Sequence, residues 1–365
     1  MWLRAQLENE TYARQALLKR IGYNQPPGMM RPNRKHLSGL ILGVDRYAWE
    51  DTASTPFSGS AVSAIGGTFV FNNAGGDLPA RVARADFDGS SADMYRYWAG
   101  FRSPRFGTVA NFAPYWSLRK GVAAWFDADT TGGTTHSDPT SKDGFKTVTT
   151  FASDESMKRR VLVQQYDIVG AAGREDQRGR YQVLLRAKLS AGSTVVRVRL
   201  LSGSYGDYEN PAQGARVPIT ATSWKFYDMG TVRNPGHRMI GGVDYLDHVL
   251  FGIAAERVSG TGSLEMDCLV FIPIEEGYIF SKVLTPGSGF PASVLQTADG
   301  KYYGYTTAVN TAYSLIEPTV KGGLPVGSGI CVIAAERDDQ SALTDTVDVD
   351  LAVYQRWETL RGAST

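Results

Sequence analysis

The sequence predicts an all-β protein with a β-sandwich at its centre. Five runs from Arg180 to Ile274 carry this prediction, since most of them alternate apolar and polar residues. They are RYQVLLRAKLS, STVVRVRLLSG, RVPITATSWKFYDMG, HVLFGIAAERV and SLEMDCLVFIPI, with Gly, Ser, Asn and Pro between them. Short alternating runs at this spacing are typical of antiparallel strands in a sandwich. A content of 40 glycines, 18 tyrosines and 7 tryptophans suits many turns and half-buried strands.

The flanking segments predict further strands. Residues 10–21 (ETYARQALLKRI) fit either a helix, because they are good helix formers, or a strand. Residues 51–64 are small and polar, as in a linker. After them, GGTFVFNN, PARVARADF and MYRYWAGFRS predict three strands, and 127–143 predicts a long polar loop. Beyond Glu276, the runs GYIFSKVL, KYYGYTTAV, GICVIAAE and DTVDVDLAVYQRW predict four more.

Length and charge narrow the class of protein. A chain of 365 residues is too long for one ordinary sandwich and long enough for two. Its net charge of +1 argues against the strong positive field of a nonspecific nucleic-acid binder, so we expect no nucleic-acid partner. The N-terminus lacks the apolar core of a signal peptide, and no apolar run approaches the roughly 20 residues of a membrane span. We therefore expect a protein made in a cytoplasm, with no membrane span.

Several short motifs resemble those of tail proteins from long-tailed phages. A GDxPA passage precedes a W-x-G-x-R-S strand, and SLEMDCLVFIPIEEGYIF is similar to the closing strand of an inserted jelly roll. Near the C-terminus, a G-x-x-P-x-G turn precedes an apolar strand and a terminal Tyr/Trp/Arg strand. The residues of the first two motifs are Gly76, Asp77, Pro79 and Ala80, then Trp98, Gly100, Arg102 and Ser103.

The resemblance implies an all-β fold in which a jelly-roll β-sandwich is inserted into a second, discontinuous β-rich domain of tail type. Residues 1–60 and 276–365 would form the tail-type domain. Residues 61–275 would form the insert, which is similar to the jelly rolls of carbohydrate-binding modules. By the same analogy, residues 10–21 would be a strand.

For function, the resemblance implies a structural protein of the virion, of distal-tail or minor-tail type, assembled in several copies in the host cytoplasm. Its partners would be other copies of itself and other phage tail proteins, with contacts concentrated in 1–60 and 276–365. The jelly roll would face outward, where host cell-surface glycans are within reach. A free-standing carbohydrate-binding protein, a glycan-degrading enzyme and a capsid decoration protein remain alternatives.

The sequence predicts neither catalysis nor a cofactor. His136, Ser137 and Asp138 are neighbours in one polar loop, whereas a hydrolase triad converges from separated positions. A glycosidase pair can always be chosen from 37 acidic residues, and nothing singles one out. We therefore expect no enzyme.

We likewise expect no metal site. Asp127, Asp129, Asp138 and Asp143 carry oxygen ligands that suit calcium, but their spacing matches no EF-hand loop. Asp348 and Asp350 share one face of a predicted strand and fit solvent exposure. Two cysteines, Cys268 and Cys331, cannot form a zinc site alone.

Two groups of residues are candidates for binding. Tyr205, Asp207, Tyr208 and Glu209 lie in the turn-rich SGSYGDYENP, where the rings could stack on a sugar and the carboxylates could accept hydrogen bonds from its hydroxyls. Tyr354, Arg356 and Trp357, in the terminal strand, are residue types enriched in protein interfaces. Arg197 and Arg199 share one strand face, which fits either solvent or an acidic neighbouring subunit.

The strand around Cys268 gives a sharper expectation about packing. Strict alternation would place Leu264, Met266, Cys268, Val270 and Ile272 on one face. We expect that face to be buried and Cys268 to be an unpaired thiol.

Overall fold

The structure is a computed structural model of the whole chain. It describes residues 2–5, 14–23, 40–44, 49–51, 54–63, 65–73, 75–89, 94–103, 115–118, 124–125, 134–151, 158–166, 179–204, 212–234, 238–240, 243–245, 249–282, 292–296, 302–306, 319–337 and 346–357. Every regular element among these residues is a β-strand, so the predicted all-β class is confirmed.

The largest sheet, sheet A, gathers strands from both ends of the chain. Its order is β1 (Trp2–Ala5), β2 (Arg14–Tyr23), β4 (Trp49–Asp51), β28 (Thr346–Trp357), β7 (Leu78–Gly89), β24 (Ala292–Gln296) and β25 (Tyr302–Thr306). In addition, β3 (Leu40–Val44) pairs with β2, and β5 (Thr55–Ser63) pairs with β28. Of the two conformations that fitted residues 10–21, the strand is therefore right for the described part, because β2 pairs with β1.

Sheet B has five strands and also mixes early and late segments. Its order is β26 (Thr319–Gly322), β23 (Gly277–Lys282), β8 (Met94–Arg102), β27 (Gly327–Arg337) and β6 (Gly67–Asn73). Sheets A and B pack face to face around residues such as Phe87, Phe101, Ile333 and Val349. We call sheets A and B together the discontinuous domain, because their strands come from residues 2–102 and 277–357.

Sheets C and D form the inserted sandwich. Sheet C has the order β11 (Thr134–Ser137), β12 (Phe145–Thr149), β22 (Leu264–Pro273), β14 (Gly179–Leu189) and β18 (Lys225–Asn234), with β9 (Tyr115–Ser117) on β22. Sheet D has the order β10 (Ala124–Trp125), β13 (Lys158–Tyr166), β21 (Val249–Ser259), β15 (Val195–Ser204) and β16 (Ala212–Gln213), with β17 (Val217–Ile219) on β15. A separate hairpin joins β19 (Arg238–Ile240) to β20 (Val243–Tyr245).

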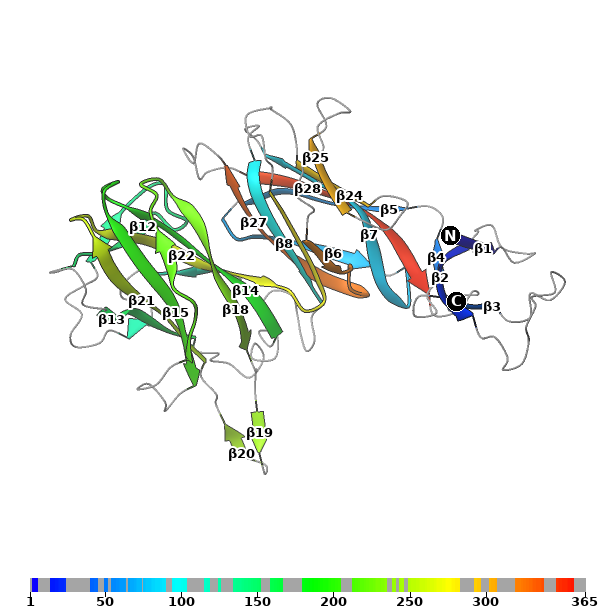
Figure 1. Ribbon diagram of the computed structural model, residues 1–365, viewed down its shortest axis with the longest axis horizontal. Helices are drawn as coiled ribbons and strands as arrows, with labels where there is room; N and C mark the ends of the chain where they lie inside the picture. The colour runs from blue at the N-terminus through cyan, green and yellow to red at the C-terminus, as the bar shows by residue number, and fades with distance from the viewer. Residues whose placement is uncertain are drawn as a thin grey trace.

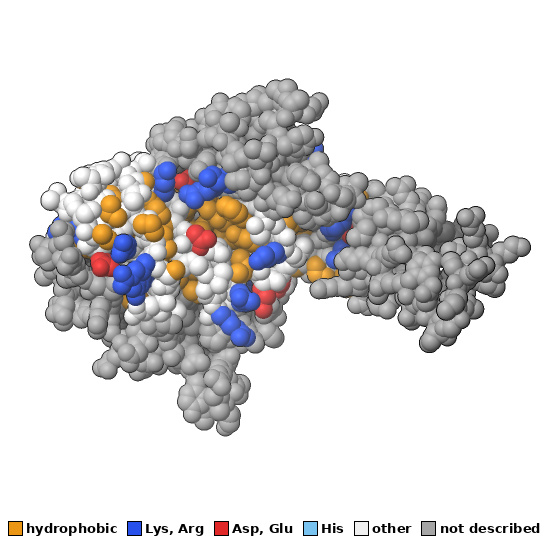
Figure 2. Space-filling view, in the orientation of Figure 1, with side chains coloured by type: hydrophobic (Ala, Val, Ile, Leu, Met, Phe, Trp, Pro, Cys, Tyr) orange, Lys and Arg blue, Asp and Glu red, His pale blue; other side chains and the backbone are white. Residues whose placement is uncertain are grey.

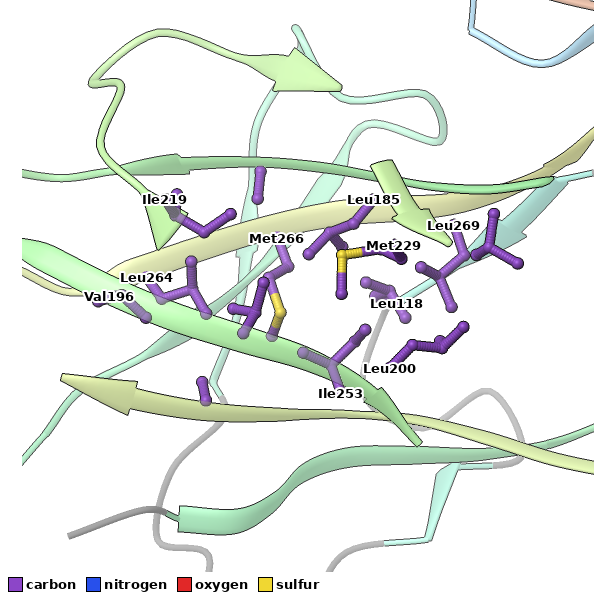
Figure 3. Packing of buried hydrophobic residues seen from close by; sticks show 14 of the residues in the cluster. Leu118, Leu185, Val196, Leu200, Ile219, Met229, Ile253, Leu264, Met266 and Leu269 are labelled. Atoms are coloured by element: carbon purple, nitrogen blue, oxygen red, sulfur yellow. The ribbon is translucent and has the colours of Figure 1, made fainter. Parts of the chain in front are cut away.

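Hydrophobic side chains from both sheets meet in the centre of the insert. Figure 3 shows Leu185, Leu264 and Met266 of sheet C close to Val196 and Ile253 of sheet D. These side chains are at most 1% exposed. Burial of this kind is the main force that holds two sheets together.

The two domains share a third hydrophobic cluster, which lies between sheets B and C. It combines Trp98 and Val332 of sheet B with Phe226, Val270 and Ile272 of sheet C. The four sheets therefore stack in the order A, B, C, D, and the central strands of B and C are covered on both faces. We call the contact between sheets B and C the junction. In Figure 1 the insert is the lobe at the left, and β1 to β4 lie at the opposite end of the molecule.

The insert begins later than residue 61, the predicted boundary. Strands β6, β7 and β8 pair with β27, β28, β23 and β24, so residues 67–102 belong to sheets A and B. The chain leaves sheet B at the end of β8 and returns at the start of β23, where Phe101 and Gly277 are paired. The sequence misplaced the boundary because a period-2 pattern does not reveal which sheet a strand joins.

The alternation expected around Cys268 is wrong for half of the strand. A β-bulge between Met266 and Cys268 inserts Asp267 as an extra residue opposite β14. Leu264 and Met266 therefore face sheet D, whereas Cys268, Val270 and Ile272 face sheet B. The expectation that Cys268 is buried and unpaired is confirmed.

Candidate functional site

Trp98 of the W-x-G-x-R-S strand lies at the centre of the junction. Its ring packs edge-on against Phe226 of sheet C, with 5.8 Å between centroids, and also against Phe280 of β23. The guanidinium of Arg96 lies 5.3 Å from the Trp98 ring centroid. Trp98 thus ties the discontinuous domain to the insert through a large buried surface.

Gly100 of the same motif lets the two sheets approach closely. A Cβ atom at this position would lie 2.2 Å from the backbone oxygen of Pro273, at the end of β22. No real Cβ contact is that short, so any side chain here would push sheets B and C apart.

Arg102 and Ser103 complete the motif with polar contacts. Arg102 is 6% exposed and donates a hydrogen bond from Nη1 to the hydroxyl of Tyr181 in β14. Ser103 donates two hydrogen bonds, from N–H at 2.6 Å and from Oγ at 2.8 Å, to Oε2 of Glu276. Glu276 directly precedes β23, so these hydrogen bonds join the point where the chain leaves sheet B, after β8, to the point where it returns, before β23.

A buried ion pair lies within sheet B, beside the junction and near Trp98. Arg96 of β8 pairs with Glu336 of β27 and also donates a hydrogen bond to the backbone oxygen of Phe226 at 3.0 Å. Glu336 is 6% exposed. Desolvation raises the pKa of Glu336, although the adjacent Arg96 opposes the shift.

A second buried ion pair occupies sheet C itself. Arg186 of β14 pairs with Asp267, the bulge residue, and the two side chains are 1% and 0% exposed. The guanidinium of Arg186 lies 4.5 Å from the centroid of Trp224, whose Nε1 donates to Oγ1 of Thr140 at 2.9 Å. Burial raises the pKa of Asp267 despite the stabilising charge of Arg186.

Lys142 links this cluster to the discontinuous domain. Its backbone N–H donates to the carboxylate of Asp267, and its Nζ donates to Oγ of Ser63 at 2.7 Å. Ser63 is the last residue of β5, in sheet A. Burial lowers the pKa of Lys142. Two hydrogen bonds of this region therefore join the domains, one from Arg96 to the backbone oxygen of Phe226 and one from Lys142 to Ser63.

The GDxPA motif closes the discontinuous domain at the other end. The N–H of Asp77 donates to the backbone oxygen of Arg356 at 3.0 Å, and Ala80 exchanges two backbone hydrogen bonds of 2.8 Å with Leu324. Leu324 lies in the G-x-x-P-x-G turn, whose Gly322 and Gly327 have positive φ. The GDxPA motif is thus in contact with the G-x-x-P-x-G turn and with the terminal strand.

The predicted assembly residues contact neighbouring strands within the chain. The guanidinium carbon of Arg81 lies 4.5 Å from the centroid of the Tyr354 ring. Nε of Arg356 lies 3.7 Å from Oε1 of Glu50. Trp357 donates from Nε1 to Oδ1 of Asp51 at 3.0 Å. The three side chains are half-buried, and their contact with another copy stays a prediction.

The predicted glycan residues lie outside the described part of the chain. Tyr205, Asp207, Tyr208 and Glu209 fall between Ser204, the end of β15, and Ala212, the start of β16. Both strands belong to sheet D, the sheet farthest from the discontinuous domain.

The residues considered for catalysis and calcium have other partners. His136 contacts Oγ1 of Thr134 at 2.8 Å, and Asp138 is buried and lies 3.3 Å from Nζ of Lys146. Burial alone would raise the pKa of Asp138, but hydrogen bonds from Thr140 and Lys146 outweigh it and lower the pKa. Asp143 accepts hydrogen bonds from Ser117 and from the N–H of Phe145. Asp127 and Asp129 lie outside the described residues.

Two further observations concern the described residues alone. Among them, no group of three His, Cys, Asp or Glu side chains is placed to hold a metal ion. They also include no helix of the length and hydrophobicity that crossing a membrane requires.

Two pairs of charged residues that the sequence placed on one strand face lie on the outer sheets. Arg197 and Arg199 share the outer face of sheet D, and Asp348 and Asp350 share the outer face of sheet A. The face drawn in Figure 2 carries Lys and Arg side chains in separate groups, with Asp and Glu side chains beside them.

Sequence reasoning missed the buried pairs Arg186–Asp267 and Arg96–Glu336. In the sequence these residues look like the polar half of an alternating strand. The covering of both sheet faces is what turns them into buried groups. A weak signal exists in SLEMDCLVFIPI, where the acidic Asp267 precedes an unbroken run of five apolar residues, Cys268 to Ile272, since unbroken runs are typical of strands buried on both faces.

The chain matches no protein-family model and no curated protein in sequence. Among solved structures, it is similar to the CBM22-1 xylan-binding domain of Paenibacillus barcinonensis Xyn10C, with 10% identity and a TM-score of 0.30 over 47% of this chain and 100% of that one. The CBM22-1–CBM22-2 tandem domain of the same protein gives 9% identity and a TM-score of 0.26 over 72% of this chain and 99% of that one.

A third solved structure comes from a phage. It is the carbohydrate esterase vb_24B_21 from the Shiga toxin-encoding bacteriophage phi24B, with 12% identity and a TM-score of 0.16 over 64% of this chain and 97% of that one. At these identities the likenesses concern the fold alone, and at these TM-scores they carry no argument about function.

Proposed function

We propose that the chain is a structural component of a phage tail or baseplate, assembled in several copies with its inserted sandwich exposed. The observation that carries the proposal is the junction. Trp98, Gly100, Arg102 and Ser103, which suggested the resemblance, all serve to hold the insert against the discontinuous domain. A subunit that bears load in an assembly needs its domains fixed, and two sheets buried on both faces provide this.

Strand edges give a second reason for assembly. Among the described residues, the four stacked sheets have several edge strands whose outer side pairs with no described strand, and such edges must be covered or protected. Neighbouring copies in a closed, symmetric assembly are a common way to cover them. The part of the chain that would make these contacts is the discontinuous domain, with the terminal strand β28 among its surfaces.

The test is the mass of the purified full-length chain in solution. We expect analytical ultracentrifugation to show a defined oligomer, and negative-stain electron microscopy to show closed particles of one size. A chain that remains monomeric across the whole accessible concentration range would overturn the proposal. It would leave the free-standing carbohydrate-binding protein as the better assignment.

The second part of the proposal is that the insert binds a glycan. It rests on the Tyr- and acid-rich segment between β15 and β16, which joins two strands of sheet D, away from the junction. We expect the double variant Tyr205→Ala/Tyr208→Ala to lose binding on a glycan array while keeping the wild-type melting temperature. Tyr354→Ala, a matched change in sheet A, should keep it. Glycan binding that survives the double variant would contradict this assignment.

A further inference from the structure

The two edges of sheet B differ in how they are protected. The edge strand β26 has four residues, TVKG, and includes the exposed Lys321. Short length and a lysine are common devices that keep an edge strand from pairing with another chain. The opposite edge strand, β6, has seven residues, GTFVFNN, with no charge and no proline. It lacks these devices.

The described strands pair with only one side of β6. Among the described residues, β6 pairs with β27 alone, and no described strand pairs with its other side. Val70, at its centre, is 64% exposed, the highest value for a large hydrophobic side chain in the described part of the chain. A β-rich, uncharged segment of this length at an exposed edge favours strand addition.

We propose that β6 pairs antiparallel with β6 of a second copy, about a twofold axis at Val70. This inference rests on the proposed function, because it names a surface through which copies assemble. The axis places Val70 opposite Val70 of the partner, Thr68 opposite Asn72, and Phe69 opposite Phe71. The two five-stranded sheets B become one continuous sheet across the contact.

The observations favour a second copy over an unrelated partner because β6 is complementary to itself. A twofold contact brings the same surface of both subunits together, so a charged residue at or next to the axis would lie close to its own copy in the partner. β6 has none. The contact would also bury Val70 against its twin and set Phe69 beside Phe71, an aromatic cross-strand pair of a kind that stabilises sheets. The expected assembly contains an even number of copies.

The first test introduces a charge at the axis. Val70→Lys would set two ammonium groups against each other in the pair, whereas the exposed side chain leaves the subunit fold unaffected. We expect the variant to lose the paired species in analytical ultracentrifugation and to halve the mass of the smallest assembly. The matched control is Val326→Lys, the same change at the other exposed valine, which is 39% exposed and lies outside β6. It should assemble like the wild type.

The second test fixes the register with a disulfide. Directly opposed residues of antiparallel strands have Cα atoms about 4.5 to 5.5 Å apart, which a disulfide spans. Val70→Cys should therefore give a covalent dimer on a non-reducing gel, and Val326→Cys should not. The native cysteines do not interfere, because both are buried.

The outcomes separate this inference from the proposed function. A wild-type chain that never associates contradicts both. A wild-type oligomer that is unchanged by Val70→Lys, or a Val70→Cys variant that forms no covalent dimer, overturns the β6 contact and leaves assembly through other surfaces intact.

Discussion

The inner sheets B and C and the outer sheets A and D contain similar strands, but their charged residues lie in different environments. In β28 of sheet A, Val347, Val349 and Leu351 are buried while Asp348 and Asp350 are exposed. In β14 of sheet C, every residue from Tyr181 to Ala187 is buried, including Arg186. A charged residue in an alternating strand thus meets water in an outer sheet and needs a buried partner in an inner one.

The largest expected effect tests that difference directly. Arg186→Ala would leave the carboxylate of Asp267 buried without its partner, and loss of one member of a buried pair costs about 4 kcal/mol. We expect urea denaturation to show this loss in the free energy of unfolding. The control is Arg216→Ala in the insert, where Arg216 is 47% exposed and lies 3.7 Å from Glu256. This change should cost about 0.5 kcal/mol. Equal losses in the two variants would break the distinction between inner and outer sheets.

The second prediction concerns how closely the inner sheets approach each other. Gly100→Ala would place a Cβ atom 2.2 Å from the Pro273 oxygen, and relief of that clash by backbone movement should cost about 3 kcal/mol. The matched change Gly192→Ala has its nearest neighbour at 3.7 Å, in a turn of the insert, and should be nearly neutral. Thermal melting of the two variants measures the difference. A Gly100→Ala protein as stable as the wild type would mean that the junction is looser than the structure indicates.

The sequence predicts the outer sheets better than the inner ones. Strict alternation in β28 and β15 identifies their buried faces correctly, because one face of each meets solvent. In β22 the same reasoning fails after Met266, since the bulge at Asp267 shifts the face by one residue. Nothing in a single sequence marks that bulge, because it depends on how β14 and β22 align.

The candidate site shows the same limit. The resemblance drew attention to Trp98, Gly100, Arg102 and Ser103, but the sequence could not show that they face a second domain. Burial on both faces depends on the stacking of four sheets. This stacking brings together residues that are distant in the sequence, such as Arg96 and Glu336. The glycan residues Tyr205 and Tyr208 are still predictions from sequence, since they lie outside the described residues.

A smaller effect concerns pH and uses two carboxylates whose pKa values shift in opposite directions. Burial raises the pKa of Glu336 above the unfolded value of about 4.3, so its contribution to stability is greatest below that pH and declines as pH rises through the folded pKa. Hydrogen bonds lower the pKa of Asp138, so its contribution is present above about pH 3.9 and is lost as pH falls through the folded pKa.

The variants Glu336→Gln and Asp138→Asn test these opposite pH dependences, because each removes one of the two titrating carboxylates. As pH falls from about 7 to about 4, the stability of the wild type relative to Glu336→Gln should increase. Its stability relative to Asp138→Asn should decrease as pH falls further, below about 3.9. Urea denaturation of the three proteins at several pH values measures both differences. Parallel pH profiles for the two variants would contradict the assigned environments.

The smallest effect should come from an aspartate of an outer sheet. Asp350 is exposed on β28 and is paired across the strands with Asp86, which forms an ion pair with Arg84 at 2.5 Å. Two carboxylates directly opposite each other repel, so Asp350→Ala should leave the free energy of unfolding within about 0.5 kcal/mol of the wild type, on the stabilising side. Added salt should shrink the gain, because it screens exposed charges. The same substitution at Asp267, in an inner sheet, would leave Arg186 buried without its carboxylate and should cost about 4 kcal/mol. Isothermal denaturation of the two Asp→Ala variants therefore measures the same chemical change at a solvent-exposed position and at a position buried between two sheets. Similar losses in the free energy of unfolding would show that the covering of sheet C does not determine how much its charged residues contribute to stability.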